Sequence, residues 1–159
     1  MRYLRLATMI LLGCLMAFGE TLPTNIYAGG VSLNPGASPK IAGTGLYARL
    51  VSDGSGTYLF SAVDALPTSV QPFAVTTQFS AGVAQRVLTI NNIPIFVPTS
   101  AGVSYNGENT GWAWTTGAMA VTRIKDKWRL MPHIRAVKSS VSNGSGYQVI
   151  IGVLIGWAE

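Results

Sequence analysis

The stretch Tyr147–Trp157, with the sequence YQVIIGVLIGW, decides how this chain folds. Every odd-numbered residue in it is apolar and an aromatic residue stands at each end, whereas the even positions include Gln148, Gly152 and Gly156. Because successive side chains of a strand point to opposite faces, the stretch predicts a β-strand with one continuous apolar face. A tilted strand that crosses a bilayer takes about 9–11 residues, and this stretch has that length. The fold therefore depends on whether the apolar face contacts lipid or a protein core.

The chain after residue 20 shows the same period of two and no helical pattern. Turn-forming clusters, among them Leu66–Ser69 and Asn91–Asn92, separate its apolar segments. The eight predicted strands span residues 25–33, 42–51, 57–65, 72–88, 93–105, 111–124, 128–140 and 147–157. No linker divides residues 20–159, so we expect one all-β domain. Its predicted architecture is an eight-stranded antiparallel up-and-down β-barrel that spans a membrane.

Residues 1–19 have the pattern of a secretory signal peptide. They begin with Arg2 and Arg5, continue with an apolar run and end on small residues. An alternative interpretation rests on residues 11–14, Leu-Leu-Gly-Cys, which resemble a lipoprotein signal with Cys14 as the lipidated residue. Both interpretations predict export. Cys14 is the only cysteine, so the exported domain is expected to hold no disulfide and no thiolate metal site.

The charge of the chain excludes some classes of partner. Charged residues make up 11% of the sequence, against roughly 25% in ordinary soluble domains. Without Arg2 and Arg5, nine Lys and Arg remain from eleven, against six Asp and Glu, and the basic residues form no runs. This pattern does not indicate nucleic-acid binding. We also expect no metal, no cofactor and no catalytic residues, because the sequence contains no metal-ligand cluster, phosphate-binding loop or nucleophile elbow.

Two observations favour lipid on the apolar side of the strands. The opposite faces are rich in Gly, Ser, Thr and Ala, with isolated Arg and Gln, as suits the crowded interior of a small barrel. Aromatic residues also fall at the predicted strand ends, where membrane barrels carry interfacial belts. The predicted inner belt is Tyr27, Tyr58, Trp128 and Trp157, and the predicted outer belt is Phe73, Tyr105, Trp112 and Tyr147.

Over residues 25–157 this pattern resembles the small eight-stranded outer-membrane barrels of Gram-negative bacteria. The resemblance implies location in the cell outer membrane, contact with membrane lipids and lipopolysaccharide, and folding by the outer-membrane assembly machinery. It also implies a structural envelope role and not general porin activity, because eight strands leave an interior that side chains fill. Chains of that family usually end on an aromatic residue, whereas here Ala158 and Glu159 follow Trp157. The sequence does not indicate an oligomeric state.

The polar faces of the strands predict a cluster of side chains in the lumen. In the second strand, Tyr47 and Arg49 are assigned to the polar face because they alternate with Leu46, Ala48 and Leu50. The faces of the third strand are ambiguous. The whole predicted lumen cluster is Arg49, Gln78, Arg86, Arg123, Arg129, His133 and Arg135, interpreted either as lumen packing or as an anion site.

Three alternatives stay open from the sequence. The first is a soluble exported barrel or sandwich that binds a small apolar ligand. The second is a lipid-A-modifying barrel enzyme built on His133, although the lipid A deacylases carry His-x-Ser-Asn where this chain reads His-Ile-Arg-Ala. The third concerns Pro94 and Pro98, which cannot donate ladder hydrogen bonds and should leave gaps towards the same neighbouring strand. These gaps predict either a lateral opening for a lipid tail or a locally bent strand.

Overall fold

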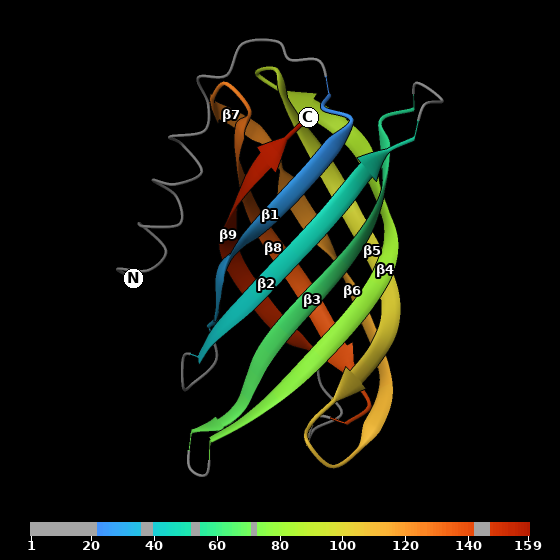
Figure 1. The fold of residues 1–159 in the computed structure, drawn as a ribbon, viewed down its shortest axis with the longest axis vertical. Coiled ribbons are helices and arrows are strands. Elements are labelled where there is room, and N and C mark those ends of the chain that lie inside the picture. The colour runs from blue at the N-terminus through green and yellow to red at the C-terminus, as the bar shows by residue number, and fades with distance from the viewer. Residues whose placement is uncertain (1–21, 36–39, 52–54, 71–72, 142–146) are drawn as a thin grey trace.

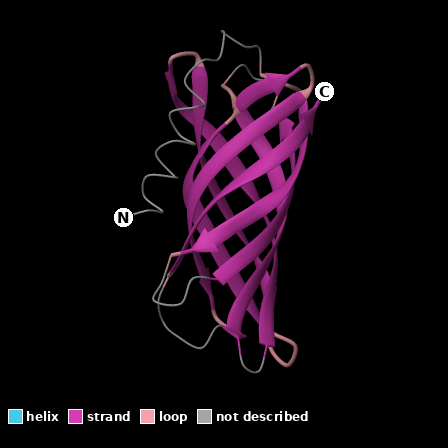
Figure 2. Ribbon diagram, turned by 90° about the vertical axis from the view of Figure 1, so that its left-hand side faces the viewer, coloured by secondary structure: helices cyan, strands magenta, loops and turns pink. Residues whose placement is uncertain are grey.

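The computed structural model describes residues 22–35, 40–51, 55–70, 73–141 and 147–159, without the side chains of 67–70 and 73–74. Within these residues the strands are β1 (Asn25–Asn34), β2 (Lys40–Leu50), β3 (Thr57–Val70), β4 (Phe73–Ile90), β5 (Ile93–Tyr105), β6 (Thr110–Ala120), β7 (Thr122–Lys125), β8 (Trp128–Ser139) and β9 (Gln148–Ala158). Val121 interrupts one barrel strand and divides it into β6 and β7. The predicted all-β fold with eight barrel strands is confirmed (Figures 1 and 2). In the described part of the chain, no helix is long and apolar enough to cross a membrane.

The sheet closes on itself. All pairs are antiparallel, and each strand pairs with its neighbours in the chain from β1 to β6. The first strand pairs with the last, from Ile26↔Ala158 to Leu33↔Ile151, and β6 pairs with β8. Closure removes the exposed edge strands that an open sheet would present for aggregation.

The register fixes how strongly the strands tilt. A row of paired residues that starts at Trp128 on β8 passes through Trp157, Tyr27 and Tyr47 and continues around the barrel. It returns to β8 at Lys138, ten residues (128 to 138) from its start. A stagger of ten residues over eight strands corresponds to a tilt of about 40°. Figure 2 shows the strands inclined to the long axis of the barrel.

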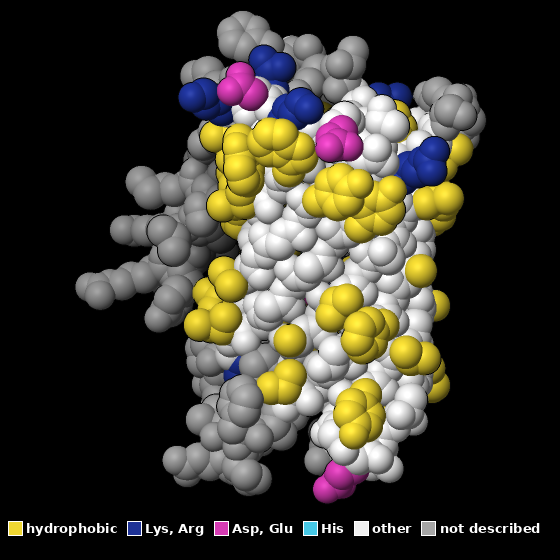
Figure 3. Space-filling view, in the orientation of Figure 1, with side chains coloured by type: hydrophobic (Ala, Val, Ile, Leu, Met, Phe, Trp, Pro, Cys, Tyr) yellow, Lys and Arg dark blue, Asp and Glu magenta, His cyan; other side chains and the backbone are white. Residues whose placement is uncertain are grey.

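The apolar face of the strands points outward. On β9, Ile155 is 52% exposed, whereas Ile150 and Leu154, which face the lumen, are almost fully buried. Val31 on β1 is 63% exposed, and Figure 3 shows groups of hydrophobic side chains scattered over the visible outer wall. A soluble barrel places its apolar face inside, and a membrane barrel places it outside. The expectation of an outward apolar face is therefore confirmed for β1 and β9.

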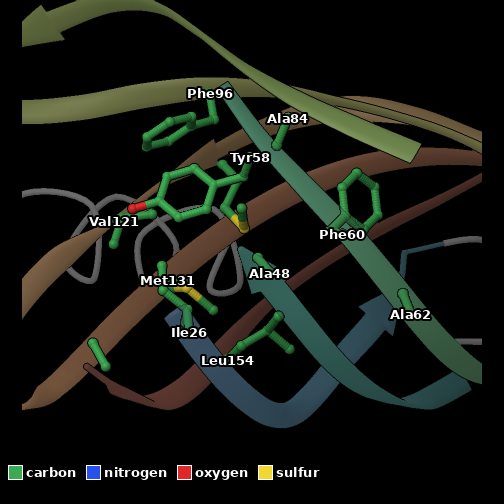
Figure 4. Packing of buried hydrophobic residues seen from close by; sticks show 12 residues of the cluster. Ile26, Ala48, Tyr58, Phe60, Ala62, Ala84, Phe96, Val121, Met131 and Leu154 are labelled. Carbon is green, nitrogen blue, oxygen red and sulfur yellow. The ribbon is translucent and has the colours of Figure 1, made fainter. Parts of the chain in front are cut away.

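The lumen is filled by side chains. Near the end of the barrel that holds the C-terminus, an apolar cluster crosses the interior and includes Tyr58, Phe96, Met131 and Leu154 (Figure 4). Elsewhere the close fit leaves no room for a larger side chain, because a Cβ at Gly82 would collide with the backbone of the neighbouring strand at Thr99. An eight-stranded barrel is just wide enough for such filling.

Two details of the predicted strands are wrong. The predicted turn at Leu66–Ser69 belongs to β3, which continues to Val70 and is paired with β4 across a register shift between Pro67 and Ser69. Leu66 is 3% exposed and packs in the lumen, so burial overrides the local turn preference of the Pro-Thr-Ser sequence. The predicted strand 111–124 is interrupted at Val121, whose N–H donates a hydrogen bond to the Pro94 carbonyl.

The predicted faces of the second strand are also wrong. Ala48 is 3% exposed and faces the lumen, whereas Tyr47 and Arg49 are exposed on the outer wall. Pairing with β1 sets this orientation, because Tyr47 is the partner of Tyr27 and both rings stack outside. Hydrophobicity alone could not decide it, since the lumen at this level is as apolar as the outside.

Candidate functional site

The polar centre of the lumen is a buried ion pair between Asp64 on β3 and Arg135 on β8. Arg135 donates from Nη2 to Oδ1 at 2.7 Å and from Nη1 to Oδ2 at 3.2 Å. Thr44 on β2 donates its hydroxyl to Asp64 Oδ1 at 2.6 Å and lies 2.8 Å from Arg135 Nη2. Side-chain exposure is 7% for Arg135 and 0% for Asp64. Three strands are thus tied together inside the barrel by charge-assisted hydrogen bonds.

Hydroxyl groups form a second set of lumen contacts. His133 Nε2 lies 2.9 Å from the Ser32 hydroxyl, and this contact joins β8 to β1 over Gly152 of the intervening strand β9. Ser139 donates its hydroxyl to Ser104 at 2.7 Å, joining β8 to β5. These contacts satisfy buried polar groups, which would otherwise cost free energy. His133 is 5% exposed, so its accessible surface is small.

The predicted lumen cluster divides into two groups. The structure buries Gln78, Arg129, His133 and Arg135 in the barrel interior, each at most 6% exposed. The remaining three are not in the lumen, which corrects the prediction: Arg49, Arg86 and Arg123. They lie exposed near the ends of β2, β4 and β7, where the side chain of a charged residue can reach water.

Sequence reasoning missed the contacts of Arg135 with Asp64 and Thr44. Asp64 lies at an even position in a strand whose faces were ambiguous, and alternation from Phe60 could have placed it inside. The pairing with Arg135 spans 71 positions of sequence, and no local pattern encodes it.

Very little space is left inside the barrel. The main internal void has a volume of about 20 Å³ and is lined by Tyr58, Phe96, Thr115, His133 and Arg135 among others. A void of this size holds about one water molecule. The lining of this void is almost entirely apolar, and the void has no room for an acyl chain or an apolar ligand.

Four outward aromatic side chains form a row at the end of the barrel near the C-terminus, here called the C-terminal rim. Tyr47, Tyr27, Trp157 and Trp128 are consecutive register partners on β2, β1, β9 and β8. The ring centroids are 5.0 Å apart for Tyr27 and Tyr47 and 5.5 Å apart for Trp128 and Trp157. We call this row the C-terminal belt.

Tyr58 does not belong to the belt in which it was predicted. It is 2% exposed and lies in the lumen, where its hydroxyl donates to the Pro23 carbonyl at 2.6 Å. Tyr47, which was assigned to the lumen, occupies the belt instead. An aromatic residue near a strand end can close the lumen or face lipid, and only strand orientation distinguishes the two.

A second group of aromatic residues lies at the opposite rim. Tyr105, Trp112 and Tyr147 are about half exposed there, and Trp114, which the prediction missed, contacts Tyr147 with a centroid distance of 5.9 Å. Lys138 Nζ lies 5.9 Å from the Trp112 centroid and 5.1 Å from the Tyr147 centroid, within cation–π range. We call these four aromatic residues the opposite belt. The spacing of Trp114 from Trp112, two positions along one strand, is the signal that could have identified it.

Three sequence predictions at the ends of the chain and strands stay outside the described structure. The side chain of Phe73 is not described. Residues 1–19 and Cys14 also lie outside the described residues.

The two belts are separated by the thickness of a membrane. On β9, Tyr147 and Trp157 are ten residues (147 to 157) apart. At a rise of about 3.3 Å per residue and a tilt of about 40°, this corresponds to about 25 Å along the barrel axis. The apolar band of outer-membrane barrels is about 25 Å tall.

The prolines of β5 interrupt its pairing with β6. Register partners are Phe96↔Met119 and Thr99↔Thr116, and no β6 partner is assigned to Val97 or Pro98. Two features bridge the interruption: the Pro94 carbonyl accepts from Val121 N–H, and the Thr99 and Thr116 hydroxyls are 3.2 Å apart. The expected gap towards one neighbouring strand is therefore present at Pro98.

The comparisons with known proteins support the fold alone. No family model matches the chain, and no curated protein matches it. A solved structure described as de novo design of transmembrane β-barrels matches with a TM-score of 0.51 and 18% sequence identity. The match covers 86% of this chain and 98% of that one. In the described residues, no group of three or more His, Cys, Asp or Glu side chains is placed to hold a metal ion.

Proposed function

We propose that this chain is an integral outer-membrane β-barrel with a closed lumen and a structural role in the envelope. The observation that carries the proposal is the apolar outer wall between two aromatic belts about 25 Å apart. The similarity to a designed transmembrane barrel agrees with membrane insertion. The predicted signal peptide agrees with export to that membrane.

The filled lumen favours a structural role over transport of solutes. The apolar cluster around Tyr58 and Phe96 crosses the interior, and the void beside it is about 20 Å³. We therefore expect no steady ion current when the chain is reconstituted in a planar bilayer.

Membrane insertion is tested by a charge placed in the apolar band. Val31 is paired with Val153, which lies four residues from Trp157 and six from Tyr147, so Val31 is near the middle of the band. Val31→Lys should destabilise the vesicle-inserted barrel by about 2–4 kcal/mol. Ile124→Lys is the matched control, because Ile124 is exposed at about the level of Trp128 at the C-terminal rim, and the same change should cost about 0–1 kcal/mol there.

The assay is urea unfolding in phosphatidylcholine vesicles, with a gel that compares unheated and boiled samples. The folded barrel should migrate differently from the boiled chain and should resist carbonate extraction. Equal costs for Val31→Lys and Ile124→Lys, or extraction of the protein by carbonate, would contradict the proposal.

The enzyme alternative has a specific experiment. His133 contacts Ser32 inside the barrel, beside a void smaller than an acyl chain. We propose that the chain is not a lipid-A-modifying enzyme, so cells with His133→Ala should have an unchanged lipid A profile. A changed profile in these cells, with normal barrel levels, would favour the enzyme.

A further inference from the structure

The two rims of the barrel differ in charge. Figure 3 shows Lys and Arg side chains gathered at the end that holds the C-terminus. The exposed basic residues described near this rim are Arg49, Arg86, Arg123, Lys125 and Lys127. The exposed acidic residues described there are Asp126 and Glu159. Among the described residues, the opposite rim has Lys40 and Lys138 against Glu108. Among the described residues, the excess of positive charge is thus larger at the C-terminal rim, with five basic residues against two acidic ones, than at the opposite rim, with two against one.

The basic side chains of this rim stand next to the aromatic belt. Lys125 is the register partner of Trp128, and Lys127 Nζ lies 5.5 Å from the centroid of the Trp157 ring. Arg49 follows Tyr47 by two positions on the same outward face of β2. Tyr and Trp rings prefer the level of the lipid head groups, and long basic side chains reach outward from that level. These cations are therefore placed at the depth of the lipid phosphates.

The opposite belt does not present charge in the same way. Lys138 lies over the rings of Trp112 and Tyr147 much as Lys127 lies over Trp157, but Lys138 is half-buried whereas Lys127 is exposed. Glu108 on the neighbouring turn adds a negative charge. This rim is close to neutral, and it has no cluster comparable with Lys125 and Lys127 among the described residues.

We propose that the C-terminal rim recruits anionic glycerophospholipids, whose phosphate groups contact the basic residues beside Trp128 and Trp157. This inference rests on the proposed membrane insertion. Basic residues near an anionic lipid surface each contribute a favourable attraction, so several of them should enrich such lipids locally by about 2–5-fold. Screening by salt should reduce the enrichment, because the contacts are exposed to solvent.

The four tryptophans of the chain provide a local readout, since two lie in each belt. The variant Trp112→Phe/Trp114→Phe keeps only the C-terminal belt reporters, and Trp128→Phe/Trp157→Phe keeps only the opposite ones. Each full-length chain is reconstituted in phosphatidylcholine vesicles with phosphatidylglycerol, and either lipid carries brominated acyl chains that quench tryptophan. Brominated phosphatidylglycerol should quench the C-terminal reporters more than its bulk fraction predicts, and the opposite reporters in proportion to that fraction.

The charge requirement is tested by Arg123→Gln/Lys125→Gln/Lys127→Gln, which should abolish the excess quenching. The matched control Lys40→Gln/Lys138→Gln removes the basic residues of the opposite rim and should leave the excess intact. Spin-labelled phosphatidylglycerol gives a second measurement of the lipid enrichment. It uses the chain that keeps all four tryptophans, so it applies even if a tryptophan variant does not fold.

The outcomes separate this inference from the function on which it rests. A barrel that inserts but whose C-terminal reporters are quenched by each lipid only in proportion to its bulk fraction would overturn the lipid preference alone. Excess quenching by phosphatidylglycerol at the opposite reporters would do the same. An excess that survives the triple substitution would overturn the assigned residues. Failure to insert into any vesicle would overturn both the proposed function and this inference.

Discussion

Replacing Arg135 by methionine would leave the Asp64 carboxylate inside the barrel without its bidentate partner. Removing one member of a buried ion pair typically costs about 3–5 kcal/mol, because a charge is left uncompensated. The Thr44 hydroxyl would still donate to Asp64, and a hydrogen bond to a charged group contributes about 1.5–3 kcal/mol. We therefore expect Arg135→Met to lower the free energy of unfolding by about 3 kcal/mol, the low end of that range.

The double variant Asp64→Leu/Arg135→Met supplies the decisive comparison. Hydrophobic residues that replace a whole buried pair are often neutral or stabilising, so the double variant should be more stable than Arg135→Met alone. Reversible urea unfolding in vesicles, followed by tryptophan fluorescence, measures all the variants in one cycle. If each single substitution cost less than about 1 kcal/mol and the two costs were additive, the pair would behave as a solvent-screened surface pair. That result would refute the reasoning that the lumen is dry at this level.

Three further predictions concern packing and turns. Gly102→Ala should strongly impair folding, because its Cβ would collide with the backbone at Phe79. Gly45→Ala should change stability by less than about 1 kcal/mol, because no neighbouring atom lies within 4 Å of the added Cβ. Urea unfolding measures the stability of both variants. The pair Tyr58→Ala/Phe96→Ala should destabilise the barrel by more than about 3 kcal/mol and produce ion leakage in a planar bilayer; a barrel that stays silent would show that other side chains close the lumen. Asn91→Val should cost about 1–2 kcal/mol, because Asn91 has a φ of 48° in the β4–β5 turn; an unchanged unfolding midpoint would contradict this.

The architecture was predictable because several strands carry an unambiguous period of two. In β9, the outward series from Val149 to Ile155 is wholly apolar, whereas the face opposite it also holds Gln148 and two glycines. The turn at Asn91–Asn92 was also readable, since asparagine tolerates the left-handed backbone that a two-residue hairpin requires. Length, alternation and turns together determine strand number in a barrel.

Strand orientation was not predictable where both faces are apolar. The lumen near the C-terminal rim is packed with residues such as Ala48 and Tyr58, which are as hydrophobic as the residues that face outward. Pattern alone therefore placed Arg49 inside and Tyr58 outside. The contact between Asp64 and Arg135 needed the register of every intervening strand, because one residue of slip exchanges the two faces.

The pairing of β1 with β9 has a consequence for the kinetics of folding. Ile26 and Ala158 are 132 positions (26 to 158) apart, whereas partners on strands that follow each other in the chain are at most 29 positions (128 to 157) apart. Bringing such distant segments together costs roughly 1.5–2 kcal/mol more loop-closure entropy than forming a hairpin. The last strand in the chain, β9, is thus also the strand that pairs with β1 and closes the barrel. Until β9 is in place, both edges of the open sheet can pair with other chains. We expect the slowest folding step to be this closure, and truncation before β9 to give aggregation in place of a smaller barrel.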